Sequence, residues 1–186
     1  MNSLIKKIAT ASTALALTAT VFSTTAFAAT TDTSVTGGTM GLTTVSAGSF
    51  GTLTLDGTTK TVTAPINTFD VTDARGTGAG WNVTVSAGAF TDATANRTLS
   101  LSSGSFTVAA PAVSKIDDGS SDLTTITAAG GTIDNGGTVK MLSAAKDGGM
   151  GGYTVAPATM TLILKPGEVY AGSYSSTITV FLTTGP

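Results

Sequence analysis

The 186-residue sequence contains no cysteine and no histidine. Without cysteine it has neither disulfide bonds nor a thiolate nucleophile, and without histidine it lacks the most common general base. It has a single glutamate, Glu168, and its ten aspartates lie mostly in turn-like sequence, where Asp side chains cap backbone groups. The converging pair of carboxylates that glycosidases use is therefore not apparent. We expect the protein not to be an enzyme.

Residues 1–28 have the pattern of a secretory signal peptide. Two lysines precede an apolar stretch at residues 8–22, and Ala26-Phe27-Ala28 then supplies an A-x-A cleavage sequence. The apolar stretch is short and rich in threonine, so it is a poor membrane span. We expect cleavage after Ala28, a secreted mature chain of residues 29–186, and no transmembrane segment. An uncleaved N-terminal membrane anchor is the alternative.

The mature chain is weakly charged and mildly acidic. Without the two lysines of the leader, seven basic residues stand against eleven acidic ones, a net charge of −4. Such a chain has no electrostatic footprint for nucleic acid or for an anionic membrane surface, so we expect neither as a partner. Hydrophobic residues still make up 41% of the sequence, which is a globular composition. Because it is exported yet lacks cysteine, the chain fits a bacterial envelope better than a eukaryotic secretory route.

About one residue in five is threonine, and β-branched side chains favour strands. No segment has convincing helical periodicity, whereas short alternating runs separated by Gly, Asn, Asp and Ser recur throughout. The runs lie near residues 53–55, 69–71, 81–87, 99–101, 106–108, 160–164 and 174–182, with weaker ones at 123–127 and 139–142. We predict eight to ten short strands in a single all-β domain, an antiparallel β-sandwich or a barrel-like fold.

Two kinds of segment could be taken for ligand loops. Residues 76–80 read Gly-Thr-Gly-Ala-Gly, but they lack the lysine of a phosphate-binding loop and precede a strand where such loops need a helix. Residues 116–122 and 134–137 gather several oxygen atoms, but neither has the spacing of a calcium loop. We interpret all three as turns and expect no metal site and no cofactor.

Trp81 is the only tryptophan of the chain. It begins an alternating run in which it shares a face with Val83 and Val85, as a buried aromatic of a sandwich would. The alternation favours a position in the core, where burial stabilises the fold by a few kcal/mol. The alternative is an exposed ring that stacks on a sugar.

Residues 69–90, FDVTDARGTGAGWNVTVSAGAF, and the C-terminal YAGSYSSTITVFLTTGP together resemble the WxL domain of Gram-positive surface proteins. The first family motif, Asp-x-Arg-Gly…Gly-Trp-x-Leu, is matched at four positions: Asp73, Arg75, Gly80 and Trp81. Val83 stands where leucine is usual. The second Trp-x-Leu aligns with Val180-Phe181-Leu182 and lacks its tryptophan. The resemblance covers the whole mature chain.

This resemblance implies a β-rich domain displayed at the cell surface and held non-covalently by peptidoglycan. The sequence ends in Phe-Leu-Thr-Thr-Gly-Pro without a sortase motif or a hydrophobic tail, which also favours non-covalent retention. We therefore expect a secreted, extracellular protein associated with the cell wall, acting beside other surface proteins. Asp73, Arg75 and Trp81 are the candidate ligand-binding residues. For the first two, an ion pair that braces the loop is the alternative.

A second hypothesis is a structural subunit of a surface layer or fibre. Threonine-rich strands with few charges are suited to edge-to-edge pairing between molecules. The segment at residues 29–45, ATTDTSVTGGTMGLTTV, would then serve as a donated strand.

Overall fold

A computed structural model describes residues 31–186, so the predicted signal peptide lies outside the described residues. The fold below is that of Val35–Pro186, which form one compact unit. Its two helices are single 3-10 turns, η1 (Leu123–Thr125) and η2 (Asp134–Gly136). In this part of the chain no helix has the length and apolar character needed to cross a membrane.

The described chain is built from antiparallel strands that form three four-stranded sheets and one small hairpin. The strands are β1 (Met40–Leu42), β2 (Lys60–Ile66), β3 (Phe69–Asp73), β4 (Trp81–Ala87), β5 (Thr91–Asp92), β6 (Arg97–Thr98), β7 (Phe106–Val108), β8 (Val113–Lys115), β9 (Ile126–Ala128), β10 (Gly131–Thr132), β11 (Thr138–Ala144), β12 (Gly151–Val155), β13 (Ala158–Leu164) and β14 (Ile178–Thr184).

Two of the four-stranded sheets join end to end into one layer. Strands β2 and β3 are separated only by residues 67–68, and β12 and β13 only by residues 156–157. Strand β3 pairs with β12, and strand β2 pairs with β13. Backbone bonds bridge the break on the next strand as well, from Ala109 N to Thr159 O at 2.8 Å and from Ala156 N to Ala112 O at 2.9 Å. The sheets β1-β3-β12-β8 and β10-β7-β13-β2 are thus two halves of one layer.

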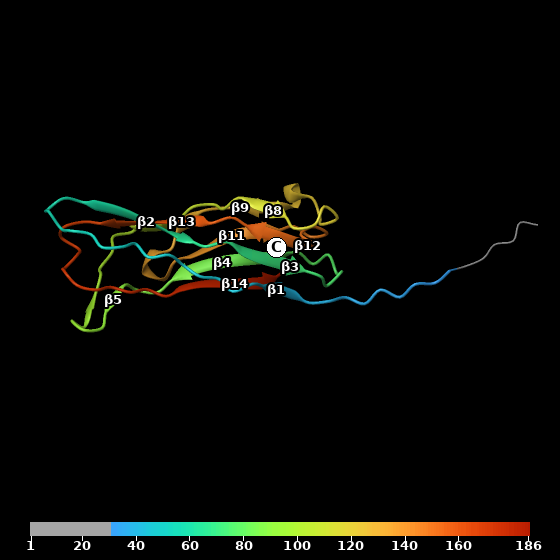
Figure 1. The fold of residues 1–186 in the computed structure, drawn as a ribbon, viewed down its shortest axis with the longest axis horizontal. Coiled ribbons are helices and arrows are strands. Elements are labelled where there is room, and N and C mark those ends of the chain that lie inside the picture. Colours follow the sequence, from blue (N-terminus) through green and yellow to red (C-terminus); the bar gives the residue numbers. More distant parts are fainter. Residues whose placement is uncertain (1–30) are drawn as a thin grey trace, which may run out of the picture. The chain divides into compact units, whose positions relative to one another are not determined.

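The third sheet, β14-β4-β11-β9, forms the second layer. In Figure 1 the strands β14, β4, β11 and β9 succeed one another from bottom to top, and β1, β3, β12 and β8 do the same. The rings of Trp81 on β4 and Tyr153 on β12 lie 6.1 Å apart, which places these two strands face to face. The sheets are open at their edges, so the structure confirms the predicted all-β fold as a sandwich.

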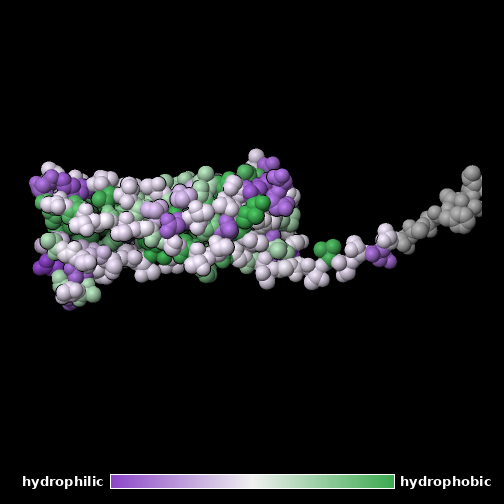
Figure 2. Space-filling model, viewed as in Figure 1, coloured by the Kyte–Doolittle hydropathy of each residue, from purple (hydrophilic) through white to green (hydrophobic). Residues whose placement is uncertain are grey.

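The core between the layers follows the alternation of the strands. On β4, Trp81, Val83 and Val85 are fully buried, whereas Thr84 and Ser86 are partly exposed. The facing layer contributes fully buried Val71 and Val155. The surface is correspondingly poor in charge, and on the face shown in Figure 2 most residues are close to neutral in hydropathy, with the strongly hydrophilic ones gathered mainly at its ends. Burial of Trp81 confirms the core interpretation of this residue.

Several strand predictions were wrong in detail: the described chain has fourteen short strands where eight to ten were predicted, and the run at 174–182 is a strand only from Ile178. Residues 53–55 form no strand, because no other strand pairs with them. Leu53 packs against the core, whereas Leu55 is 41% exposed. The run at 99–101 is not a strand either: the ladder of β5 and β6 ends at Thr98, and Leu99 N makes one further bond to Phe90 O. Residues 123–127 begin as the 3-10 turn η1, since the Asp122 carboxylate accepts a bond from Thr124 N and caps it.

Candidate functional site

The loop between β3 and β4 is closed by an ion pair between Asp73 and Arg75. The guanidinium donates from Nε to Asp73 Oδ1 and from Nη2 to Asp73 Oδ2, both at 2.8 Å. The backbone N of Arg75 donates to the same Oδ1 at 3.1 Å. The side chain of Asp73 is 1% exposed and that of Arg75 is 17% exposed. This bidentate geometry fixes the direction in which the chain leaves β3.

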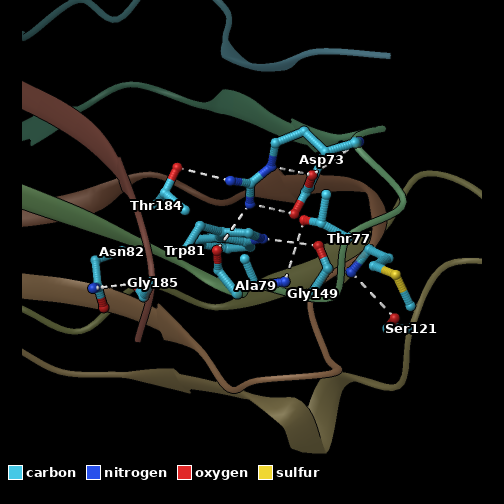
Figure 3. A network of polar contacts seen from close by, with 12 residues as sticks. Asp73, Thr77, Ala79, Trp81, Asn82, Ser121, Gly149, Thr184 and Gly185 are labelled. Atoms are coloured by element: carbon cyan, nitrogen blue, oxygen red, sulfur yellow. Dashed lines mark hydrogen bonds and ion pairs between the residues drawn. The ribbon is translucent and has the colours of Figure 1, made fainter. Parts of the chain in front are cut away.

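Arg75 also joins this loop to the end of β14. Its Nη2 donates to Gly80 O at 2.8 Å, and its Nη1 donates to Thr184 Oγ1 at 2.7 Å (Figure 3). Gly80 O accepts a second bond from Gly185 N at 3.1 Å. The side chain of Asn82 donates to Gly185 O, so two residues flanking Trp81 hold the same C-terminal segment. Arg75 is thus bonded to a residue 109 positions later in the sequence.

The two charges stabilise each other. Hydrogen bonding from Arg75 lowers the pKa of the Asp73 carboxyl, although burial opposes this change. The same hydrogen bonding raises the pKa of Arg75. Both carboxylate oxygens of Asp73 and all three side-chain nitrogens of Arg75 have partners within the protein. The arrangement is that of a brace between β3, β4 and β14.

Trp81 is anchored in the core by its indole nitrogen. Its Nε1 donates to Gly149 O at 2.8 Å, and its side chain is fully buried. The neighbouring Tyr153 hydroxyl lies 3.0 Å from both Ser121 O and Met150 O. Because none of the indole surface is exposed, the ring is not available to stack on a sugar at the surface. The structure therefore places Asp73, Arg75 and Trp81 in one network, with Trp81 inside the sandwich (Figure 3).

Two glycines make room for this network. Gly80 has a φ of +72°, and a Cβ there would lie 2.5 Å from Ala144 O. Gly149 has a φ of +68°, and a Cβ there would lie 2.6 Å from the indole nitrogen of Trp81. The left-handed backbone conformation and the close approach both favour glycine. The glycine before Trp81 is thus part of the packing and not only of a flexible turn.

The described residues show no arrangement typical of catalysis or metal binding. Within residues 31–186 no three acidic side chains come close enough to hold one metal ion. Ser143 and Lys146 have the Ser-x-x-Lys spacing, but this spacing brings the side chains together on a helix, and here they lie on β11 and the turn after it. We find no pair of groups placed for nucleophilic attack at this position.

Two hollows of the surface contain no free converging polar groups. One, of about 80 Å³, lies beside Phe90, Leu99 and Phe106 and is too small for an ordinary ligand, which needs roughly 300 Å³. The other, of about 390 Å³, is large enough but wide open to solvent, and it lies beside Ser120 and Ser121, whose hydroxyls bond to the backbone of residues 150–152. The main exposed feature on a strand is instead Phe181 of β14, at 61% exposure. It was not predicted as a site residue, although it stands between Thr179 and Thr183 on the polar side of an alternating run.

Comparison with known proteins gives one match. Residues 23–186 match the family model of the WxL domain, described as surface cell wall-binding. No curated protein and no solved structure matches the chain. The matched range includes the loop of Asp73 and Arg75 as well as β14, the two parts of the chain that Arg75 holds together.

Proposed function

The chain belongs to the WxL family of surface cell-wall-binding domains, and from this premise we propose that the mature protein is a non-enzymatic domain that binds peptidoglycan non-covalently. The match over residues 23–186 is the observation that carries the proposal. We further propose that residues 1–28 direct export from a Gram-positive cell, and that residues 29–186 act at the wall beside other surface proteins.

The use of the acidic side chains supports a role without catalysis. Asp92 accepts bonds from the backbone N of Thr94, Ala95 and Ser173, and it thereby holds two loops together. Glu168 accepts from the backbone and the hydroxyl of Ser102. These hydrogen bonds lower the pKa of both groups, so neither carboxyl is a proton donor near neutral pH.

For Asp73, Arg75 and Trp81 we propose a positioning role in wall binding. The brace ties the start of β4 to the end of β14, and the buried indole ties β4 to the loop before β12; β4 and β14 belong to one outer face of the sandwich. A ligand on that face would depend on the three residues without touching the indole. Substitutions of these three residues would weaken binding only to the extent that they lower the stability of the fold.

Extraction of intact cell walls tests the non-covalent attachment. We expect a chaotrope or hot detergent to release the full mature chain without digestion of the wall, because no covalent bond has to be broken. Mass spectrometry of the released chain should show an N-terminus at Ala29. Release only after muramidase digestion, with wall fragments still attached, would contradict the proposal.

A second candidate function, a subunit of a layer or fibre, is favoured by the free edge of β14. Gly88 N bonds to Thr177 O and Gly185 N to Gly80 O, so the odd-numbered residues of β14 pair with β4. The backbone groups of the even-numbered residues then face the unpaired side. Between Ile178 and Thr184 there is no lysine or proline of the kind that protects edge strands.

Light scattering coupled to size exclusion separates the two candidates. An assembling subunit would grow in mass with protein concentration and form particles visible by negative stain. A monomer that persists at high concentration would rule out assembly by the mature chain alone. We expect the monomer, because Met40–Leu42, within the segment that would be donated, already pair with β3 of the same chain.

A further inference from the structure

The outer face of the sheet β14-β4-β11-β9 carries the side chains that do not enter the core. Cross-strand pairing arranges them in three rows: Thr179, Ser86 and Thr138; Phe181, Thr84 and Lys140; and Thr183, Asn82, Ser143 and Thr127. The middle row thus contains one aromatic ring and one cation. The rows on either side contain hydroxyl side chains and Asn82, which is buried and donates its amide to Gly185 O.

The exposure of Phe181 is not explained by folding. Its neighbours on β14, Val180 and Leu182, pack against the core, whereas Phe181 is 61% exposed on the opposite side. A single ring among hydroxyl groups is also too small an apolar area for a typical protein interface. It does suit a sugar, whose C–H face can lie on the ring while its hydroxyl and acetamido groups bond to threonine and serine.

Charge on this face indicates an acidic ligand. The four strands contain no aspartate or glutamate, and Lys140 is the charged residue among them. The mature chain has a net charge of −4, so the face is positive on an otherwise acidic protein. Lys140 and Phe181 are both paired with Thr84, which puts them two strand spacings apart, about 10 Å. Peptidoglycan offers sugar rings with carboxylates of its stem peptides close by.

We infer that the outer face of the sheet β14-β4-β11-β9 binds a glycan strand of peptidoglycan, with Phe181 stacking on a sugar ring and Lys140 pairing with a carboxylate. The inference rests on the proposed wall-binding function and assigns it a face and a ligand class. Thr84 lies between the two residues, and its hydroxyl donates to the backbone oxygen Phe181 O at 3.5 Å, so its side chain stays close to the backbone of the sheet. A glycan strand can therefore cross β4 on its way from Phe181 to Lys140.

The test compares variants of the mature chain for binding to purified peptidoglycan stripped of teichoic acids. Phe181→Ala should weaken binding about tenfold or more, the loss expected for an aromatic contact of this kind. Phe181→Tyr should bind like the original chain, and Phe181→Leu should behave like the alanine variant, because an aromatic face is required. Tyr170→Ala is the matched control, since Tyr170 is 62% exposed but lies in the loop between β13 and β14, under the cation of Arg97.

Lys140→Gln tests the ionic contact. We expect weaker binding at low salt and little difference at 1 M salt, where the Debye length falls to about 3 Å. Lys146→Gln, on a turn outside this face, should leave binding unchanged. Thermal unfolding of each variant should stay close to that of the original chain, because both replaced side chains are exposed.

The outcomes separate this inference from the function it rests on. If the original chain binds peptidoglycan and Phe181→Ala binds equally well, the face is wrong and wall binding stands. Full binding by Phe181→Leu would overturn the stacking on a sugar. Binding to teichoic acid alone would overturn the ligand class. If the original chain binds no wall component, the proposed function itself fails.

Discussion

At the scale of single residues, Trp81 joins the two layers of the sandwich. Its indole fills the core beside Tyr153 and donates to the carbonyl of Gly149. Trp81→Phe removes that bond and part of the packing, so we expect the free energy of unfolding to fall by about 2–4 kcal/mol. Urea denaturation measures the loss. A variant that is still folded should bind peptidoglycan normally, and folded Trp81→Phe without binding would contradict the positioning role.

The ion pair of Asp73 and Arg75 predicts a dependence of stability on pH. Because the pKa of Asp73 is lowered in the folded state, its contribution is complete above the unfolded pKa of about 4 and is lost as the pH falls through the folded value. At pH 7, Asp73→Asn should cost about 2–3 kcal/mol, since it leaves the half-buried Arg75 without its counter-charge.

Denaturation of the original chain and of Asp73→Asn from pH 7 to pH 2 checks this prediction. The difference in stability between the two should shrink toward low pH. Other carboxyls with a lowered pKa, such as those of Asp92 and Asp122, weaken both proteins in acid and cancel in the comparison. A difference that stays constant with pH would show that the ion pair does not contribute through its charge.

At the scale of elements, the turn from β3 to β4 contains glycines with different roles. Gly76 and Gly80 both have positive φ, but only Gly80 lies against the backbone of Ala144 and Ala145. Gly80→Ala should therefore cost about 3 kcal/mol, from the strained conformation and the clash together. Gly76→Ala meets no atom within 4 Å and should cost about 1 kcal/mol. Equal melting temperatures of the two variants would contradict this assignment.

The elements also show how far the sequence could predict the fold. The strand Trp81–Ala87 was predictable because its alternation is strict and its inner face is buried. Residues 53–55 alternate too, but whether such a run becomes a strand depends on a partner that the local pattern does not reveal. The breaks between β2 and β3 and between β12 and β13 interrupt what would otherwise be two long strands. They occur at matching places in neighbouring strands, and the local pattern does not reveal that match either.

The candidate site was predictable only in its local part. The spacing of Asp73 and Arg75 in one loop allowed the ion pair to be stated as an alternative, and the structure contains it. The bond from Arg75 to Thr184 joins residues 109 positions apart, and no local pattern indicates it. Phe181 was visible in the sequence as an aromatic on the polar side of a run, although it was not interpreted as a ligand contact.

At the scale of the whole molecule, the described chain is a sandwich in which the polar contacts of Arg75 lie within and between loops, and in which several acidic side chains, such as Asp92 and Asp122, accept bonds from backbone groups. This leaves open sheet faces, and not an enclosed pocket, as the surfaces on which a long polymer can lie. The match to a surface cell-wall-binding family agrees with such a surface.

The measurement that tests this account most directly is co-sedimentation of the mature chain, residues 29–186, with purified peptidoglycan over a range of concentrations. We predict saturable binding by the folded protein, reversed by a chaotrope, with the peptidoglycan left uncleaved. A mature chain that is folded and stays in the supernatant at every concentration would contradict the account.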